Sequence, residues 1–230
     1  YNLISIVFRK PYKVEFRVYD DGVAYRFITS FKDSLIVQNE VASFYFSASS
    51  AAYFPSIHKR ADADIFHTSF EELYPLRPLD SIKNTEVGYS PVLVTQPGKP
   101  KIAIAESDLE EYPGMFISGT GSNRLQAIFA PYPLEEKMTG GDYPQSIVIK
   151  RANYIAKTKG TRTFPWRVLM IADEDRQLPS NDIVYRLASP SRIGDASWVH
   201  PGKGTDEWTI NVNLFNVPFR SGVNTASYKY

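Results

Sequence analysis

The segment KIAIAESDLEEYPGMF (residues 101–116) carries four carboxylates within six residues: Glu106, Asp108, Glu110 and Glu111. The apolar run before them predicts a strand that ends in a polar loop. If the strand continued, side chains 106, 108 and 110 would share one face, where like charges repel unless a cation or an arginine neutralises them. Hard carboxylate oxygens suit Ca²⁺, although the DxDxDG spacing of an EF-hand is absent. These residues alone favour a solvated turn, with a metal site as the alternative.

The other residue types that carry enzyme chemistry do not form a recognisable site. The chain has no cysteine, which excludes thiol catalysis, disulfides and thiolate zinc sites. The three histidines, His58, His67 and His200, lack metal-ligand spacing, and neither HEXXH nor a GxSxG nucleophile elbow is present. A sandwich-fold sugar epimerase would need His and Glu converging as general acid and base, for which His58 and His67 are candidates.

Composition and charge limit the possible partners. Lys and Arg number 26 against 25 Asp and Glu, so the formal net charge is +1. No basic field is available to bind phosphates, and the sequence therefore predicts no nucleic-acid partner. No apolar run approaches the roughly 18–20 residues that span a bilayer. Aromatic residues make up 14 % of the chain, and such rings either stack on sugars or fill a core.

Short alternating runs dominate the first 175 residues. KVEFRVYDDGVAYRFITS (residues 13–30) has apolar residues at every second position. Within it, Asp21-Gly22 predicts a hairpin, because glycine tolerates the positive φ of a two-residue turn. Prolines and glycines separate the runs, and long helical periodicity is missing. The pattern predicts a large antiparallel β-sandwich over residues 1–175.

Residues 173–193 (DEDRQLPSNDIVYRLASPSRI) break this pattern. Ser180 or Asn181 can cap a short helix that Pro190 stops, with apolar positions at Ile183, Val184 and Leu187. The final segment, FNVPFRSGVNTASYKY, starts a second helix without completing it, which suggests that the native polypeptide continues. We therefore expect residues 176–230 to form a helical linker that leads into a further domain. Trp166, Trp198 and Trp208 lie late in the chain, where a linker would be solvated, which favours them over other rings for contact with sugar.

Several stretches taken together resemble one family over nearly the whole chain and in the same order. They are FRVYDDGVAYRF, AYFPSIHKRADADIFHTSFEELY, PVLVTQPGKPKIAIAESDLEEYPGMF, RLQAIFAPYPLEE, FPWRVLMIADEDRQLPSNDIVYRLASP, DASWVHPGK and FRSGVNTASYKY. This set is similar to the amino-terminal part of glycoside hydrolase family 97, the calcium-dependent α-glucosidases and α-galactosidases. This chain departs from the family pattern at His200, where the family usually has lysine. The following GTDEWT keeps Trp208 but has Asp206 and Thr209 where further tryptophans are expected.

The family resemblance implies a super-β-sandwich like that of galactose mutarotase, a helical linker and a catalytic (β/α)₈ barrel. A barrel needs about 250 residues, and this chain would stop where the barrel begins. The family's catalytic carboxylates lie on the barrel, so none is assigned here. The resemblance thus implies a periplasmic, exo-acting α-glycosidase that removes terminal α-linked sugars from oligosaccharides. This chain would be an inactive fragment of that enzyme.

The same resemblance implies a role for the carboxylates of residues 106–111. In this family the sandwich packs on the barrel and contributes a glutamate to a calcium ion beside the scissile bond. The matching position is Glu106, with Asp108 as second choice, while Glu110 and Glu111 become surface charge. The barrel would supply the other ligands, and Trp208 is assigned to substrate contact.

Two other functions stay open at this stage. The aromatic content and the sandwich fold fit a stand-alone carbohydrate-binding module, which would bind oligosaccharides without the barrel. A mutarotase-like isomerase would use the histidines as acid and base. The sequence does not choose between glucoside and galactoside, or between inversion and retention, because barrel carboxylates decide the latter.

Overall fold

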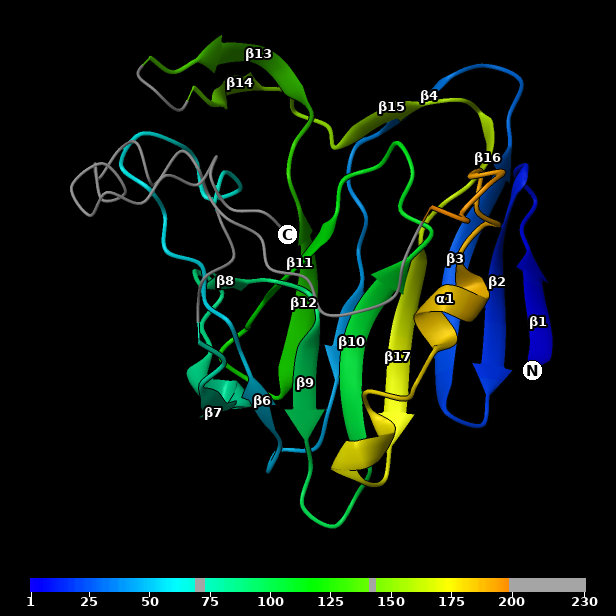
Figure 1. The fold of residues 1–230 in the computed structure, drawn as a ribbon, viewed down its shortest axis with the longest axis vertical. Helices are drawn as coiled ribbons and strands as arrows, with labels where there is room; N and C mark the ends of the chain where they lie inside the picture. The colour runs from blue at the N-terminus through cyan, green and yellow to red at the C-terminus, as the bar shows by residue number, and fades with distance from the viewer. Residues whose placement is uncertain (69–72, 141–143, 199–230) are drawn as a thin grey trace. The chain divides into compact units, whose positions relative to one another are not determined.

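The computed structural model describes residues 1–68, 73–140 and 144–198, which form mostly antiparallel strands with little helix (Figure 1). The chain divides into two compact units. One contains residues 1–137 and 146–189, and the other contains residues 138–145 and 190–230. The predicted all-β antiparallel fold is confirmed. The boundary at residue 175 stays a prediction.

The first unit is built on a nine-stranded sheet in the order β1-β2-β3-β17-β10-β9-β6-β7, with β16 beside β3. Its members are β1 (Asn2–Val7), β2 (Tyr12–Tyr19), β3 (Gly22–Ser30), β6 (Ala51–Tyr53), β7 (Leu76–Pro78), β9 (Val92–Thr95), β10 (Lys101–Ser107), β16 (Thr161–Thr163) and β17 (Trp166–Ala172). Strands distant in sequence lie side by side, because β17 pairs with both β3 and β10. This placement brings the carboxylate segment beside residues from both ends of the chain.

A smaller sheet has the order β5-β12-β11-β8. Its strands are β5 (Ser43–Tyr45), β8 (Val87–Gly88), β11 (Met115–Ser118) and β12 (Arg124–Phe129). Two-stranded sheets pair β13 (Pro133–Met138) with β14 (Ser146–Arg151), and β4 (Leu35–Val37) with β15 (Ala156–Thr158). The remaining elements are η1 (Leu79–Ser81), η2 (Asp175–Gln177) and α1 (Ile183–Leu187).

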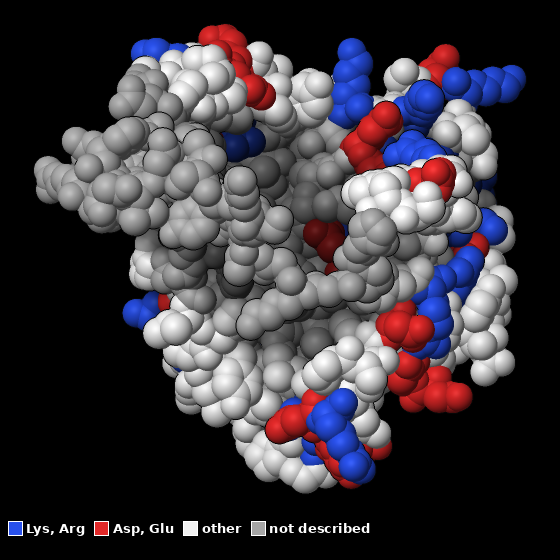
Figure 2. Space-filling view, viewed as in Figure 1, with Lys and Arg blue, Asp and Glu red and all other residues white. Residues whose placement is uncertain are grey.

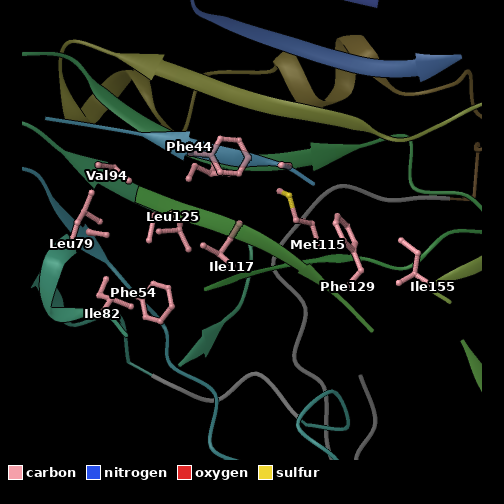
Figure 3. Packing of buried hydrophobic residues seen from close by; sticks show 14 of the residues in the cluster. Phe44, Phe54, Leu79, Ile82, Val94, Met115, Ile117, Leu125, Phe129 and Ile155 are labelled. Atoms are coloured by element: carbon pink, nitrogen blue, oxygen red, sulfur yellow. The ribbon is translucent and has the colours of Figure 1, made fainter. Parts of the chain in front are cut away.

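The main hydrophobic core fills the space between the two large sheets. Ile104 and Val94 of the larger sheet pack with Phe44, Leu125 and Ile117 of the smaller one, and all five are buried. Figure 3 shows Phe44, Val94, Ile117 and Leu125 with Phe54, Leu79, Ile82, Met115, Phe129 and Ile155 along the strands. The faces that meet here are those that the period-2 alternation marks as apolar.

The short helix α1 packs on the opposite face of the larger sheet, beside β10 and β17 (Figure 1). Ile183 and Leu187 pack on Ala105, Trp166 and Val168 in a second buried cluster. The predicted short helix is confirmed, but its N-cap is Asp182 rather than Ser180 or Asn181, and the Asp182 side chain makes no capping hydrogen bond. The side-chain oxygen of Asn181, one residue earlier, accepts a hydrogen bond from the Ile183 N–H at 3.2 Å. Among the described residues, no helix has the length and apolarity needed to cross a membrane.

The predicted hairpin of residues 13–30 is confirmed, but its glycine has a different role. Tyr19 pairs with Gly22, so the two-residue connection is Asp20-Asp21 and Gly22 is the first residue of β3. Gly22 does not adopt the positive φ that we expected. A Cβ atom there would lie 2.6 Å from the Leu169 carbonyl oxygen and 2.8 Å from the Ile183 side chain. Glycine is needed because β17 and α1 approach closely.

We predict that Gly22→Ala lowers the free energy of unfolding by about 1–3 kcal/mol, because the added methyl group overpacks against backbone that cannot rotate away. Gly194→Ala is the control, since nothing lies within 4 Å of a Cβ atom at that position. Urea denaturation of both variants measures the difference. Equal stability of the two variants would contradict the packing explanation.

Candidate functional site

Glu106 lies near the end of β10, in a row of paired residues that crosses three strands. It pairs with Arg167 of β17, which pairs in turn with Tyr25 of β3. Ile104 and Leu169, two residues away along the same strands, pack in the core between the sheets. Since alternate residues of a strand share a face, Glu106 and Arg167 point into the same inter-sheet layer.

The Glu106 carboxylate is held by one backbone amide and one guanidinium. The Met115 N–H donates to both oxygens, at 3.0 Å to Oε1 and 3.1 Å to Oε2. Arg167 Nη1 donates to Oε2 at 2.7 Å. The Glu106 side chain is 16 % exposed, in contrast with 1 % for Arg167. The carboxylate is therefore largely buried and retains a solvent-facing side.

A second carboxylate shares the same arginine. Arg167 donates through Nε to Glu40 Oε1 at 2.6 Å and through Nη2 to Glu40 Oε2 at 2.7 Å, a bidentate pair. The Tyr112 hydroxyl donates to Glu40 Oε2 at 3.1 Å. The guanidinium also lies 4.8 Å from the centre of the Phe129 ring. We call Glu40, Glu106, Tyr112 and Arg167 the inter-sheet polar cluster.

The inter-sheet polar cluster contains two carboxylates and one guanidinium. Burial raises the pKa of Glu106, and the negative charge of Glu40 adds to the rise against the opposing effects of Met115 and Arg167. Burial is the largest single effect on the pKa of Arg167 and lowers it, but the hydrogen bonds to Glu40 and the negative charges of Glu40 and Glu106 together raise that pKa above its usual value. Burial also raises the pKa of Tyr25 to about 12. The site thus holds an excess of negative charge in a poorly solvated position.

Asp108 is bound by a different set of residues. Strand β10 ends at Ser107, and Asp108 adopts a left-handed conformation with φ of 59°, which aspartate tolerates better than most residues. Its Oδ1 accepts a hydrogen bond from the Ser189 N–H at 2.9 Å, and its Oδ2 lies 3.9 Å from Arg26 Nη1. The strand alternation therefore stops before Asp108. The structure gives Glu106 and Asp108 different partners and does not bring them into one cluster.

The remaining carboxylates of the segment lie on the surface, as expected. Glu110 and Glu111 are exposed, and their backbone carbonyls accept hydrogen bonds from Arg162. Within residues 1–68, 73–140 and 144–198, no group of three or more His, Asp or Glu side chains could hold a metal ion. Glu106 as a calcium ligand, with Asp108 as its alternative, stays a prediction.

The aromatic and histidine candidates are placed as follows. Trp166 is fully buried in β17 rather than exposed in a linker, while Trp198 is 68 % exposed. His58 is exposed and His67 half-buried. Trp208 and His200 lie outside the described residues, so their assignments stay predictions. On the face drawn in Figure 2, basic and acidic side chains are interspersed, consistent with the near-zero net charge.

Comparison with known proteins identifies the family. Residues 1–190 match the family model described as glycosyl-hydrolase 97 N-terminal. The chain belongs to this family. It is 37 % identical over 233 residues to a retaining alpha-galactosidase of Bacteroides thetaiotaomicron, and the match covers 100 % of this chain and 35 % of that enzyme. The chain therefore spans about a third of the length of this relative.

Solved structures support the same fold. A glycoside hydrolase family 97 enzyme from Pseudoalteromonas sp. strain K8 in complex with panose matches with a TM-score of 0.64 and 22 % identity, covering 83 % of this chain and 25 % of that one. The enzyme from the same strain in complex with acarbose matches with a TM-score of 0.63, at the same identity and coverage. The family resemblance and the sandwich fold are both confirmed.

Three residues of the inter-sheet polar cluster, Glu40, Tyr112 and Arg167, were not predicted as site residues from the sequence. Arg167 stands in an otherwise apolar strand, WRVLMIA, and a buried arginine requires an acidic partner. That signal could have marked Arg167, but it does not say which acid binds it. Glu40, in the stretch VQNEVAS, has no local pattern that predicts burial.

We predict that Glu40→Gln lowers the free energy of unfolding by about 3–5 kcal/mol, since it leaves the buried Arg167 with Glu106 alone. The control is Glu135→Gln, which breaks an exposed pair with Lys150 and should cost less than about 1 kcal/mol. Guanidinium denaturation of the 230-residue chain at pH 7 distinguishes them. A Glu40 variant as stable as the control would contradict the importance of this ion pair.

A second prediction concerns the pH dependence of two glutamates. Because folding raises the pKa of Glu106, this residue stabilises the fold at pH values below the pKa it has in the unfolded chain. That stabilisation is lost as the pH rises through the pKa of Glu106 in the folded protein. Arg77 lowers the pKa of Glu86, so that glutamate contributes stability at higher pH and loses it as pH falls. Between pH 4 and 8, Glu106→Gln should gain stability relative to wild type as pH rises, and Glu86→Gln should lose it.

Denaturation midpoints of the 230-residue chain, measured with a chelator at each pH, give both trends. Wild type is the reference at every pH. The explanation fails if the two variants follow parallel curves, because burial and ion pairing shift a carboxyl pKa in opposite directions.

Proposed function

We propose that the chain is the non-catalytic sandwich domain of an exo-acting, calcium-dependent α-glycosidase. The parent enzyme removes terminal α-linked sugars from oligosaccharides, and its catalytic carboxylates lie in a barrel beyond these residues. The sandwich packs on that barrel and supplies one ligand to its calcium ion. The location is periplasmic, as the family resemblance implies.

One observation carries this proposal. The chain matches a retaining alpha-galactosidase along its entire length at 37 % identity, yet covers 35 % of that enzyme. A glycosidase with the same domain order is the simplest parent for a chain of this kind. The relative's name favours an α-galactoside as substrate over an α-glucoside.

The chemistry of Glu106 fits a calcium ligand. Calcium takes carboxylate oxygens from several parts of a protein, and Glu106 keeps a partly exposed side while its other side is held by Met115 and Arg167. Two carboxylates against one guanidinium leave negative charge that a cation would offset. When bound, the ion would supply charge stabilisation beside the scissile bond. The residues of this chain hold and orient the carboxylate.

The test uses the full-length parent enzyme with aryl α-galactoside and aryl α-glucoside substrates. We expect hydrolysis of at least one substrate and loss of most activity in a chelator, restored by calcium. Glu106→Gln should lower kcat/KM by at least about tenfold, while Glu111→Gln, at an exposed position of the same segment, should not.

Three outcomes would contradict parts of the proposal. If neither substrate is hydrolysed, the proposed glycosidase activity is rejected. If the chelator leaves the activity unchanged, the proposed calcium dependence is rejected. Calorimetric binding of maltose or melibiose to the 230-residue chain alone would instead favour a stand-alone carbohydrate-binding module.

A further inference from the structure

The two oxygens of Glu106 are not equivalent. Oε2 accepts hydrogen bonds from both Met115 and Arg167, whereas Oε1 accepts one from Met115 alone. The Met115 N–H is shared between the two oxygens, so it uses only part of the acceptor capacity of Oε1. The oxygen with the more open acceptor positions is therefore Oε1.

Gly114 lies beside this oxygen. A Cβ atom at Gly114 would be 3.4 Å from Oε1 of Glu106 and 3.7 Å from the Leu109 side chain. These are contact distances, so the missing methyl group leaves open the space next to Oε1. Gly114 does not have a positive φ. Its backbone conformation therefore does not require glycine, and an alanine fits without strain.

Arg167 cannot follow Glu106 if the carboxylate moves. Its Nε and Nη2 atoms are both committed to Glu40, and that carboxylate also accepts a hydrogen bond from the Tyr112 hydroxyl. The guanidinium is 1 % exposed and lies against the Phe129 ring. A planar group held at two nitrogens by one carboxylate has a fixed orientation. The third nitrogen, Nη1, thus presents a fixed donor to Oε2.

We propose that Arg167 is a positioning residue for the cation ligand of the parent enzyme. Held by Glu40, it fixes Glu106 through Oε2, so that Oε1 faces the space beside Gly114 and binds a divalent cation from that side. Glu40 offsets the positive charge of Arg167, which would otherwise repel the cation. This inference rests on the proposed role of Glu106 as a calcium ligand.

A purely structural role for Arg167 makes a different prediction. In that case, variants of Arg167 lower the stability of the protein, and calcium affinity falls only in proportion to the fraction of protein that has unfolded. A positioning role requires that affinity falls in a protein that is still folded. Hydrogen bonds behind a metal ligand typically account for about 10–100-fold in metal affinity.

The experiment measures calcium binding to the full-length parent enzyme by calorimetry, after chelation and dialysis, together with the melting temperature of each apo variant. Arg167→Lys keeps the charge and removes the planar fork, and we expect about 10–100-fold weaker binding. Gly114→Ala places a methyl group beside Oε1 and should weaken binding with an unchanged melting temperature.

Two controls match these variants. Glu86→Gln disrupts another bidentate arginine–glutamate pair, with Arg77, outside the inter-sheet polar cluster. Ile117→Val lowers packing in the hydrophobic core and leaves every residue of the inter-sheet polar cluster in place. Both should keep the wild-type calcium affinity even where the melting temperature falls. Glu106→Gln reports whether this residue binds the ion at all.

The outcomes separate the two proposals. If Glu106→Gln weakens calcium binding while Arg167→Lys and Gly114→Ala do not, the positioning role is overturned and the ligand role stands. If Arg167→Lys weakens binding no more than Ile117→Val at an equal loss of melting temperature, its role is structural. If Glu106→Gln binds calcium as wild type does, both the ligand and its positioning are rejected.

Discussion

The buried guanidinium of Arg167 is the constraint on which this end of the sandwich depends. A charge taken out of water is tolerated only when it is paired and hydrogen-bonded. Arg167 belongs to the larger sheet, whereas its bidentate partner Glu40 precedes β5 of the smaller sheet. Their ion pair therefore fixes one sheet against the other at a distance of 127 residues in sequence. The position of Glu106 follows from this pairing, because it shares the same arginine.

Much of the fold could be predicted because its causes are local. Alternating residues in KVEFRVYDDGVAYRFITS predict two strands and a hairpin, and both are present. A capping residue at 180 or 181, followed by apolar residues at helical spacing, predicts the short helix, which is present with its N-cap at Asp182. The role of Gly22 could not be predicted, since it depends on Leu169 and Ile183, which approach from distant parts of the chain. The turn residues correctly predicted the hairpin, but the reason that they suggested for the glycine, a positive φ, was wrong.

In the candidate site, too, features with local causes could be predicted from the sequence and those that depend on tertiary contacts could not. The carboxylate segment was visible in the sequence, and the family resemblance selected Glu106 within it. Strand alternation alone would have grouped Glu106 with Asp108, but the left-handed turn at Asp108 directs that residue to Ser189 and Arg26. Glu40 could not be found, because only the pairing of β17 with β10 and the packing of the sheets bring it to Arg167.

Stability and function make opposite demands on the two glutamates. Glu40 has both oxygens paired to Arg167, so its charge is compensated where it lies. Glu106 is paired only with the remaining nitrogen of Arg167, Nη1, and burial raises the pKa of Glu106. An apolar residue or an amide at position 106 would relieve that cost without disturbing the pair that joins the sheets. A carboxylate kept at an energetic disadvantage is expected where a ligand, rather than the fold, requires the charge. The cation proposed for Glu106 would supply the missing compensation.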